Sequence, residues 1–564
     1  MIVGIDLGTT NSLLAVWHDG SPRIVRSATG RDLTPSAVSV AEDGHILVGD
    51  AARDRLVSHP ERSIGYFKRF MGSDRQLTIA GRQFRPEELS ALVIRQLLDD
   101  AEADTGARPT DAVISVPAYF SDAQRKATRT AGQLAGLNVE RLVNEPTAAA
   151  MAYGLHELAD ERLIVVIDLG GGTLDVSILE FFDGVMEVHA TAGDNHLGGR
   201  DFDESITTWF TKEIGLSIDE LRTAEQARLI AASEAARHRL TDSDAAVLTL
   251  AQSRRFRGEL VHQAELTRTT FESLCAPLLS RMQIAIERAI RDSKLSLDQI
   301  TDVILVGGAT RMALVRSLVS RMFQRIPLSR PDPDRIVAEG AAVQAALKAR
   351  DASLKDVVLT DVCPYTLGIE VSEELDSGML ETGRYLPIIE RNLTVPVSRV
   401  NTVAPITERQ KQLKVNIFQG ESRLVSNNIL LGSVDVPLPR RGDRNVDVRF
   451  TYDVDGILEV EVVVPGREPT HLVINNSGTS LDEAEIAKRL KALEGLKVHP
   501  RDDALNIALL AKLDRLYEES LGASRDEIAS VARAFEAALS TQDPSRVEDA
   551  RAKVEAFMEA YLGQ

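Results

Sequence analysis

The segment IVGIDLGTTNSLLAVW (residues 2–17) reappears in outline as VVIDLGGGTLDVSILEF (residues 165–181). Each copy reads as an apolar strand, an Asp-Leu-Gly tripeptide, a turn rich in glycine and threonine, and a second strand. Around these copies, residues 1–350 alternate short β-branched runs with long amphipathic stretches such as 86–105 and 271–293, which is typical of α/β folds. The duplication predicts two related lobes.

Both copies carry residues suited to a phosphate group. Asp6 and Asp168 end the first strands, and the turns that follow contain Thr9, Thr10 and Asn11 in one copy and Gly171, Gly172 and Thr173 in the other. Glycines let backbone N–H groups turn toward an anion, and threonines add donors. A carboxylate beside a phosphate requires a cation between them, a role that hydrated Mg²⁺ fills. One such turn alone is more often a plain β-turn, but two copies with matching flanks favour a clamp for a polyphosphate.

Composition and charge exclude several classes of protein. The 564 residues carry 84 Asp and Glu against 65 Lys and Arg, a net charge of −19, which disfavours nucleic acid as a partner. There is no run of 18 apolar residues, no basic leader before the first strand, and no cysteine pattern around Cys275 and Cys363 that would bind zinc. Walker A, HExxH and GxSxG motifs are absent. We expect a cytoplasmic protein without a membrane segment.

The texture of the sequence changes along the chain and predicts four regions. Residues 1–355 form the α/β region, and 356–362 read as a linker, with one more edge strand as the alternative. Residues 363–479 alternate apolar and polar positions, as in LKVNIFQG and GILEVEVVV, and predict a β-sandwich. Residues 480–564 are predicted to form helices. The signals are capping boxes at 480–483 and 524–527, the pair Asp543-Pro544, and the helical spacing of Leu505, Leu509, Leu513 and Leu516.

Further motifs extend the phosphate pattern. Glycine pairs occur in HLGGRDFD (196–203) and VGGATR (306–311). In VNEPTAAAMAYG (143–154), Glu145 precedes Pro146 and so lies at the start of a helix, where the dipole favours an anion. An ordinary helix cap is the alternative for Glu145.

Several of these motifs occur together in one order. Over essentially the whole chain, the sequence resembles the seventy-kilodalton heat-shock chaperone family (DnaK-type). The motifs that carry the resemblance are GIDLGTTNS, VPAYFSDAQR, NEPTAAAMAYG, DLGGGTLDVSIL, HLGGRDFD, VILVGGATRM and VVLTDVCPYTLGIE. The short helical end favours the HscC-like bacterial branch. The resemblance implies a multidomain protein with an actin-like two-lobed ATPase domain, then a peptide-binding all-β sandwich, then a short α-helical lid.

The resemblance also assigns roles in ATP hydrolysis. It implies that Lys68 in YFKRFMG stands beside the γ-phosphate, although an isolated lysine is usually a solvated surface residue. It implies that Glu145, Asp175 and Thr173 serve catalysis, the first two by positioning water, and that Asp6 and Asp168 hold hydrated Mg²⁺ with K⁺ nearby. The nucleotide itself, ATP or ADP, would contact Thr9, Thr10, Asn11, Gly171, Gly172, Thr173, Gly198, Gly199, Glu234, Arg237, Thr241, Gly307, Gly308, Arg311 and Asp334. Arg237 and Thr241 replace the family's usual Lys and Ser, and Arg can still stack on adenine.

Outside the nucleotide site, the resemblance implies a coupling linker at Val357, Val358, Leu359 and Asp361, and a J-domain contact at Arg141. It places an extended apolar peptide against Val403, Leu413 and Val415, with Ser372 and Ile406 at the positions that arch over it. Alternation alone would make Leu413 and Val415 ordinary sandwich core. Because Ser372 is small and polar and the helical end is short, we expect fast peptide release even with ADP bound.

Other functions use an actin-like fold. A sugar kinase or a filament protein would not need the β-module and helical tail, whereas a nucleotide-regulated scaffold that never refolds its clients is hard to distinguish by sequence. The expected partners are unfolded or extended apolar polypeptides, a J-domain co-chaperone and, as a further candidate, a nucleotide-exchange factor, with no nucleic acid and no membrane.

Overall fold

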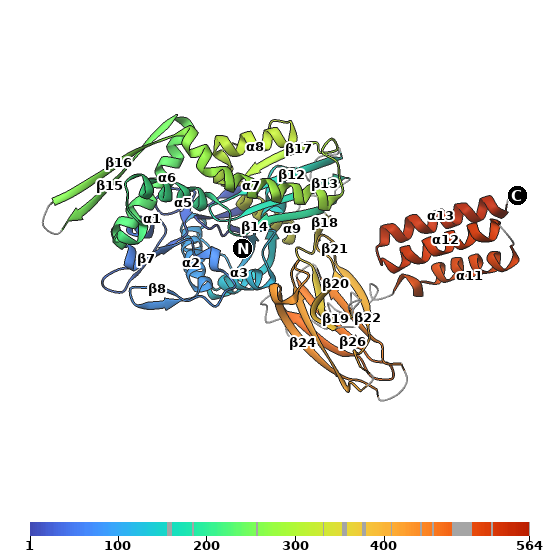
Figure 1. The fold of residues 1–564 in the computed structure, drawn as a ribbon. Helices are drawn as coiled ribbons and strands as arrows, with labels where there is room; N and C mark the ends of the chain where they lie inside the picture. Colours follow the sequence, from blue (N-terminus) through green and yellow to red (C-terminus); the bar gives the residue numbers. More distant parts are fainter. Residues whose placement is uncertain are drawn as a thin grey trace. The chain divides into compact units, whose positions relative to one another are not determined.

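The computed structural model describes residues 1–154, 161–182, 185–254, 258–330, 332–351, 358–374, 380–407, 409–439, 443–453, 456–475, 499–520 and 523–562. The chain divides into two compact units (Figure 1). The first contains Met1–Tyr365 with Arg391–Thr394, and the second contains Thr366–Glu390, Val395–Ile474 and the C-terminal helices. The predicted order of an α/β region, antiparallel sheets and helices is confirmed.

The first lobe of unit 1 is built on the sheet that contains the first Asp-Leu-Gly hairpin. Its strands run in the order β11 (Asn138–Asn144), β10 (Asp111–Val116), β1 (Ile2–Asp6), β2 (Asn11–His18) and β3 (Ser21–Ile24), with β4 (Thr34–Pro35) also pairing with β2. The apolar residues of one face pack on α2 (Pro86–Thr105) and α3 (Asp122–Leu134). This burial is what fixes the hairpin at the centre of the lobe.

The second lobe repeats the plan. Its sheet runs in the order β17 (Asp302–Val306), β12 (Arg162–Leu169), β13 (Leu174–Phe182), β14 (Val185–Asp194) and β18 (Val358–Val362). β12 pairs antiparallel with β13 and parallel with β17, just as β1 pairs antiparallel with β2 and parallel with β10. The predicted duplication of a lobe is therefore confirmed in the topology.

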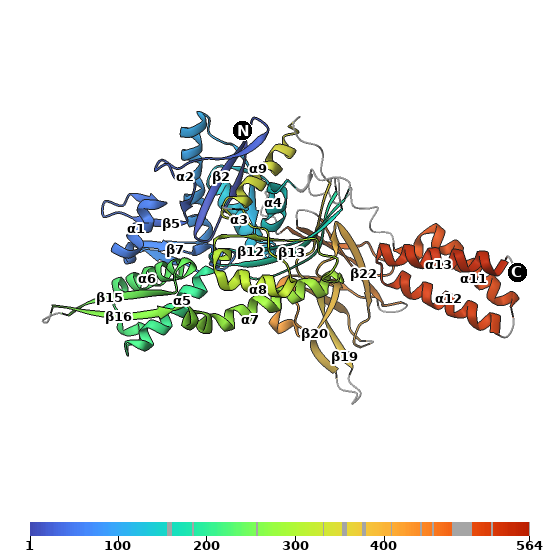
Figure 2. The ribbon, with the colours of Figure 1, turned by 90° about the horizontal axis from the view of Figure 1, so that it is seen from above.

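Helices cover both faces of the second sheet. One face packs on α5 (Gly199–Glu213), α6 (Thr223–Asp242), α7 (Arg268–Ser293) and α8 (Ala313–Phe323), and the other on α4 (Glu145–Ala152) and α9 (Ile336–Lys348). Figure 2 shows α7 and α8 on one side of β12 and β13 and α4 and α9 on the other.

Helices α4 and α9 cross at the base of the two lobes with almost no side chain between them. A Cβ on Gly340 would lie 1.7 Å from the carbonyl oxygen of Ala148, so backbone meets backbone at this crossing and only glycine fits. On its other side, α9 approaches β1 as closely, since a Cβ on Gly4 would lie 2.1 Å from the backbone nitrogen of Ala342.

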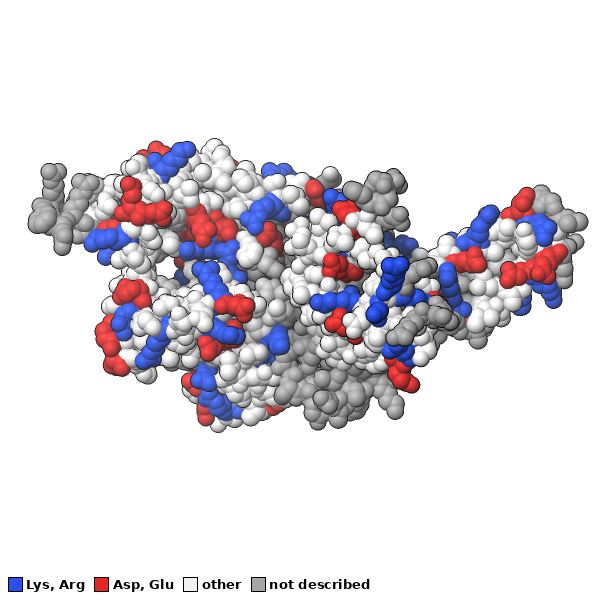
Figure 3. All heavy atoms as spheres, turned by 60° about the horizontal axis from the view of Figure 1, so that its bottom comes forward, with Lys and Arg blue, Asp and Glu red and all other residues white. Residues whose placement is uncertain are grey.

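Smaller elements border the lobes. They are α1 (Asp50–Ser58), β5 (Ala37–Val40), β6 (Ile46–Val48), β7 (Ser63–Gly65), β8 (Leu77–Ile79), β9 (Arg82–Phe84), β15 (Ala245–Arg254), β16 (Gly258–Thr267) and the 3₁₀ helices η1 (Pro60–Arg62), η2 (Phe67–Phe70), η4 (Ile218–Glu220) and η5 (Gly308–Arg311). Figure 1 shows β15 and β16 projecting from the end of the unit beside α6. Figure 3 shows acidic and basic side chains interspersed over the face drawn, rather than gathered by sign.

The predicted linker forms the strand β18. It pairs in parallel with β14 through Val185↔Val358, Met186↔Leu359 and Glu187↔Thr360. The two interpretations of this apolar strip, a connection and an edge strand, thus describe the same segment. Val357 lies outside the described residues.

Unit 2 begins with two four-stranded antiparallel sheets. One contains β20 (Leu380–Ile389), β19 (Leu367–Glu374), β23 (Gln412–Gln419) and β24 (Ile429–Pro437), and the other β22 (Val397–Val403), β25 (Val446–Tyr452), β26 (Ile457–Val463) and β27 (Thr470–Asn475). The short η6 (Val425–Asn427) completes the β-region, whereas the short β21 (Thr394–Val395) pairs with β18 at the edge of the second-lobe sheet. Glu459, a polar position of the alternating segment GILEVEVVV, is only 5% exposed and lies 3.2 Å from His471.

Three α-helices, α11 (Ala504–Glu519), α12 (Ala523–Ser540) and α13 (Pro544–Leu562), follow the short η8 (Pro500–Asp502) in the described C-terminal part. Leu509, Leu513 and Leu516 enter their shared core, but Leu505 is exposed, contrary to the predicted stripe. Ser524 lies inside α12 rather than capping it, whereas Asp543 accepts hydrogen bonds from the first turn of α13 as predicted. The capping box at 480–483 lies outside the described residues.

None of the helices that the structure describes combines the length and the apolar character required to cross a membrane.

Candidate active site

A cavity of about 320 Å³ opens in unit 1, and both Asp-Leu-Gly turns line it. This volume lies at the lower end of the range of small-molecule sites. Of the residues assigned from the sequence, the cavity wall contains Asp6, Thr9, Thr10, Asn11, Lys68, Glu145, Asp168, Gly171, Thr173, Gly199, Glu234, Arg237, Gly307, Gly308, Arg311 and Asp334. The chain thus brings together side chains from both lobes that are hundreds of residues apart.

The two turns contact each other. A Cβ on Gly171 would lie 1.9 Å from Oγ1 of Thr10, and one on Gly172 would lie 2.8 Å from Cγ2 of Thr9. Gly198, at the start of α5, packs behind them, since its Cβ would lie 2.3 Å from the nitrogen of Gly172. Gly172 and Gly198 therefore shape the turns from behind and do not line the cavity itself.

Four carboxylates meet at the floor of the site, of which Asp6, Glu145 and Asp168 line the cavity and Asp175 does not. Asp6 and Asp168 end β1 and β12, Glu145 begins α4, and Asp175 lies on β13 opposite Asp168. Burial, followed by the charge of Glu145, raises the pKa of Asp6 and of Asp175 to about 7 and raises the pKa of Asp168 well above its ordinary value. So many buried carboxylates are costly without cations, because each must otherwise give up its charge.

Lys68 supplies one of those cations. It is 3% exposed, and its Nζ lies 2.9 Å from Oε1 of Glu145, the only ion pair that these four carboxylates form among the described residues. Burial alone would lower the pKa of Lys68, but Glu145 and Asp6 outweigh it and raise it. The alternative of a solvated surface lysine is therefore wrong. Lys68 is held charged, and the remaining negative charge suits a divalent cation with oxygen ligands such as Mg²⁺.

Asp175 is positioned by residues that the sequence analysis missed. Its Oδ1 accepts a hydrogen bond from the backbone N–H of Tyr119 at 2.9 Å. The carbonyl of Tyr119 accepts in turn from Tyr365 Oη at 2.7 Å and from Asn195 Nδ2 at 3.0 Å, and the two tyrosine rings lie 4.7 Å apart. Tyr365 follows the linker by three residues, so a chain of contacts joins the linker region to Asp175. Only the VPAYF motif hinted at Tyr119.

The opposite end of the cavity carries arginine–carboxylate pairs. Arg237 is buried and donates from Nε to Oδ1 of Asp203 at 2.7 Å, and Arg311 lies 2.9 Å from Asp334. Burial raises the pKa of Asp203 to about 6, against the lowering effect of Arg237. The sequence analysis assigned Arg237 to the nucleotide site but did not identify its partner Asp203. Thr241 lies one turn further along α6 and lines a neighbouring hollow that shares Arg237 with the cavity, so its contact with the nucleotide stays a prediction.

Further residues at the mouth of the cavity were also missed. Arg53 and Tyr66 line the wall, and Arg53 lies 3.6 Å from Glu234, which is on the other lobe. The guanidinium of Arg200 lies 4.8 Å from the ring centroid of Tyr66. These contacts cross the opening, so no local sequence pattern could reveal them.

The coupling residue Asp361 lies on the linker strand β18. It accepts a hydrogen bond at 2.6 Å from Nδ2 of Asn144, the residue that precedes Glu145. Burial raises the pKa of Asp361. Arg141, the residue assigned to a J-domain contact, lies on β11 in the sheet of the first lobe and donates to Oε1 of Gln344 at 3.3 Å.

The residues assigned to a client peptide are spread over the sandwich. Leu413 and Val415 lie on β23, whereas Val403 ends β22 in the other sheet. Val415 is 2% exposed and sits in the packed interior. Ser372 lies on β19 opposite a bulge of β20, where Thr382 and Gly383 face this one residue, and Ile406 lies in the loop after β22 with half of its surface exposed. The five residues thus come from two sheets and a loop, and their assignment to a client peptide stays a prediction.

Known proteins resemble this chain over nearly its full length. The family model described as Hsp70 protein matches residues 2–80 and 73–560. The Chaperone protein DnaK of Thermotoga neapolitana is 41% identical, with 87% of this chain and 83% of the relative covered. Proteins of the same name from Thermosipho africanus and Deinococcus radiodurans are 40% and 38% identical, covering 93% and 99% of this chain and 89% and 94% of theirs.

Proposed function

Because this chain belongs to the Hsp70 family of ATP-hydrolysing chaperones, we propose that its cavity hydrolyses ATP to control how the β-sandwich holds extended apolar segments of unfolded proteins. The observation that carries the proposal is the buried Lys68–Glu145 pair among three further carboxylates, at the floor of a cavity lined by two contacting glycine–threonine turns. Phosphoryl transfer to water needs this kind of positioning and charge stabilisation more than covalent chemistry.

Each part of the cavity has a role in this proposal. The backbone N–H groups and hydroxyls around Thr9–Asn11 and Gly171–Thr173 hold the phosphates. Lys68 stabilises charge that develops on the γ-phosphate, and Glu145 and Asp175 orient the attacking water. Asp6 and Asp168 would hold Mg²⁺ through its waters, and the bound ion supplies charge neutralisation between phosphate oxygens. K⁺ ions would use oxygen ligands of the same region.

The base end of the nucleotide would lie against Arg237. Its side chain is fixed by Asp203, so its guanidinium plane is held in one orientation before the nucleotide binds. A preorganised arginine can stack on adenine at a low cost in side-chain entropy. This supports adenine recognition despite the replacement of the family's lysine.

We also propose the division into an ATPase domain at 1–355, a linker at 356–362, a peptide-binding domain at 363–479 and a lid at 480–564. The short helical end supports membership of the HscC-like branch, and we propose the cytoplasm as the location. Clients, a J-domain protein at Arg141 and a nucleotide-exchange factor are the proposed partners. Arg141→His should reduce hydrolysis stimulated by a J-domain protein more than basal hydrolysis, and equal effects on both would remove Arg141 from that contact.

Weak trapping of the client follows from the residues at the arch. Ser372 offers no apolar bridge, so we expect fast peptide dissociation in ADP, measured by fluorescence anisotropy. Val415→Phe should abolish peptide affinity and leave basal ATPase intact. Because Val415 is buried, the added bulk also costs about 1–3 kcal/mol of sandwich stability, so circular dichroism must first show that the variant is folded. Unchanged affinity in the folded variant would place the pocket elsewhere.

The decisive experiment measures ATP hydrolysis by the purified chain with and without a library of unfolded peptides. Stimulation by peptides supports the chaperone cycle. ATPase activity that peptides leave unchanged would favour the nucleotide-regulated scaffold, and ADP release that depends on a sugar would favour a kinase.

A further inference from the structure

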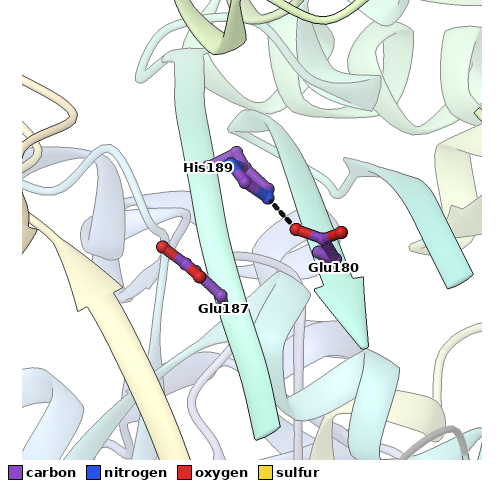
Figure 4. A group of neighbouring side chains, drawn as sticks. All are labelled: Glu180, Glu187 and His189. Atoms are coloured by element: carbon purple, nitrogen blue, oxygen red, sulfur yellow. Dashed lines mark hydrogen bonds and ion pairs between the residues drawn. The ribbon is translucent and has the colours of Figure 1, made fainter. Parts of the chain in front are cut away.

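A second cluster of chemically active side chains lies on β13 and β14, outside the nucleotide cavity (Figure 4). Glu180, Glu187 and His189 each offer one ligand atom, and these atoms all lie within 4.8 Å of one another. Nε2 of His189 is 2.5 Å from Oε2 of Glu180. All three side chains are half-buried, so they are reachable from solvent yet partly shielded from it.

The two glutamates are neighbours on adjacent strands, and no lysine or arginine balances them in the part of the chain that the structure describes. Glu180 and Glu187 are direct cross-strand partners, an arrangement that destabilises a sheet when both side chains are charged. The next cross-strand partners on either side are Leu163 on β12, opposite Glu180, and Thr360 on the linker strand, opposite Glu187, and neither of them carries a charge. Among the described residues, no lysine or arginine pairs with either glutamate.

A β-bulge adds the histidine. Leu179 pairs with Val188 and Ile178 pairs with Ala190, so His189 is the extra residue on β14. Such bulges change the direction in which a side chain points. Figure 4 shows the ring of His189, on the same strand as Glu187, turned toward Glu180 on the neighbouring strand. The bulge therefore brings an imidazole to a site that already holds two carboxylates.

A similar group in the sandwich is balanced internally. His471 lies 3.2 Å from Glu459 and 3.9 Å from Glu461, but Arg449 lies 3.6 Å from Glu461 and neutralises it. The comparison shows that a histidine between two glutamates needs no ion where an arginine is present. The cluster on β13 and β14 has no such arginine among the residues that the structure describes.

We propose that Glu180, Glu187 and His189 bind a divalent transition-metal ion, with Zn²⁺ as the best fit. Imidazole nitrogen and carboxylate oxygen are common Zn²⁺ ligands, and three protein ligands leave a fourth position for water. In a tetrahedron with bonds of about 2.0–2.2 Å, ligand atoms lie roughly 3.3–3.6 Å apart. Side-chain rotation is enough to reach that spacing from the present one. The ion would neutralise both glutamates and join β13 to β14 next to Thr360, the residue of the linker strand that pairs with Glu187.

The test is a titration of the metal-stripped full chain with ZnCl₂, in the presence of excess Mg²⁺ and ADP to occupy the nucleotide site. We expect one calorimetric site that His189→Ala weakens at least about tenfold, since loss of even an outer-shell partner typically costs 10–100-fold in metal affinity. Glu187→Gln should weaken it similarly. His471→Ala is the matched control and should leave the affinity unchanged. Co²⁺ absorption in place of Zn²⁺ reports the ligands directly.

A second readout separates binding from accidental effects of substitution. Zn²⁺ should slow hydrogen exchange of the amides of residues 185–189 in the wild type and not in the folded His189→Ala chain. Zinc affinity that is the same in His189→Ala and wild type would overturn the proposal, as would the absence of any zinc site. In either case the cluster would be an ion pair only.

Discussion

Lys68→Ala is the most direct perturbation of the proposed active site. It removes the cation that lies 2.9 Å from Glu145 and raises the charge imbalance among four buried carboxylates. A group that stabilises transition-state charge in a preorganised site contributes about 10²–10³ in rate, so we expect single-turnover hydrolysis to fall by that factor. ATP affinity should fall far less, because the turns and Arg237 remain.

The same substitution also has a cost in stability. Removing one partner of a buried ion pair typically costs about 3–5 kcal/mol, and both side chains here are less than a tenth exposed. That cost should shrink in acid, where the carboxyls bind protons. The assay compares single-turnover hydrolysis and nucleotide affinity in Lys68→Ala with Lys126→Ala, an exposed lysine on α3. Hydrolysis near the wild-type rate in a folded Lys68→Ala chain would refute the assignment.

Four further outcomes test other parts of the molecule. The pKa of Asp6 and of Asp175 is raised to about 7, so their contribution to stability is present below about pH 4 and is lost as pH rises through 7. The nucleotide-free ATPase unit should therefore have a lower melting temperature at pH 8 than at pH 5. Calorimetry in two buffers should show that protons are released when Mg²⁺ and ADP bind. Val358→Asp should leave peptide affinity intact but abolish its dependence on ATP, and normal ATP-driven release would make the strand a mere connector. Tyr365→Phe should raise the hydrogen-exchange rate of the linker amides by about fivefold, because it removes one hydrogen bond of about 1 kcal/mol. An unchanged exchange rate would show that Tyr365 does not stabilise the docked linker. Gly340→Ala should lower the melting temperature of the ATPase unit far more than Gly30→Ala, whose new methyl group meets nothing and whose cost is confined to the strain of its φ of +75°. Equal melting temperatures would contradict the tight helix crossing.

The hairpins could be predicted from sequence because they are local. Asp6 and Asp168 each lie a few residues from the turn they serve, so the strand–turn–strand pattern carries the whole arrangement. The burial of Lys68 could not be read from its neighbours, since it depends on Glu145, 77 residues later. Asp203 and Tyr365 were missed for the same reason: their partners come from other elements, and no periodicity records them.

Amphipathic patterns also failed where tertiary packing differs from simple alternation. Glu459 stands at a polar position of an alternating strand, yet it is only 5% exposed and pairs with His471 on the neighbouring strand. Leu505 has the spacing of its neighbours in α11, yet it lies in the first turn, beyond the reach of the shared helical core. Periodicity identifies a face, and the neighbouring elements decide how far along that face burial extends.

Because β18 pairs in parallel with β14, the sheet of the ATPase unit can bind an added strand at this position. Whenever Val358–Val362 leaves, the N–H and C=O groups of Val185–Glu187 that it had bonded are left as an open sheet edge. An extended segment added to such an edge is bound mainly through its backbone, which every polypeptide shares. The linker therefore competes with any strand that reaches β14, including the linker of a second molecule, and a free peptide of sequence VLTDV becomes an inhibitor of linker docking.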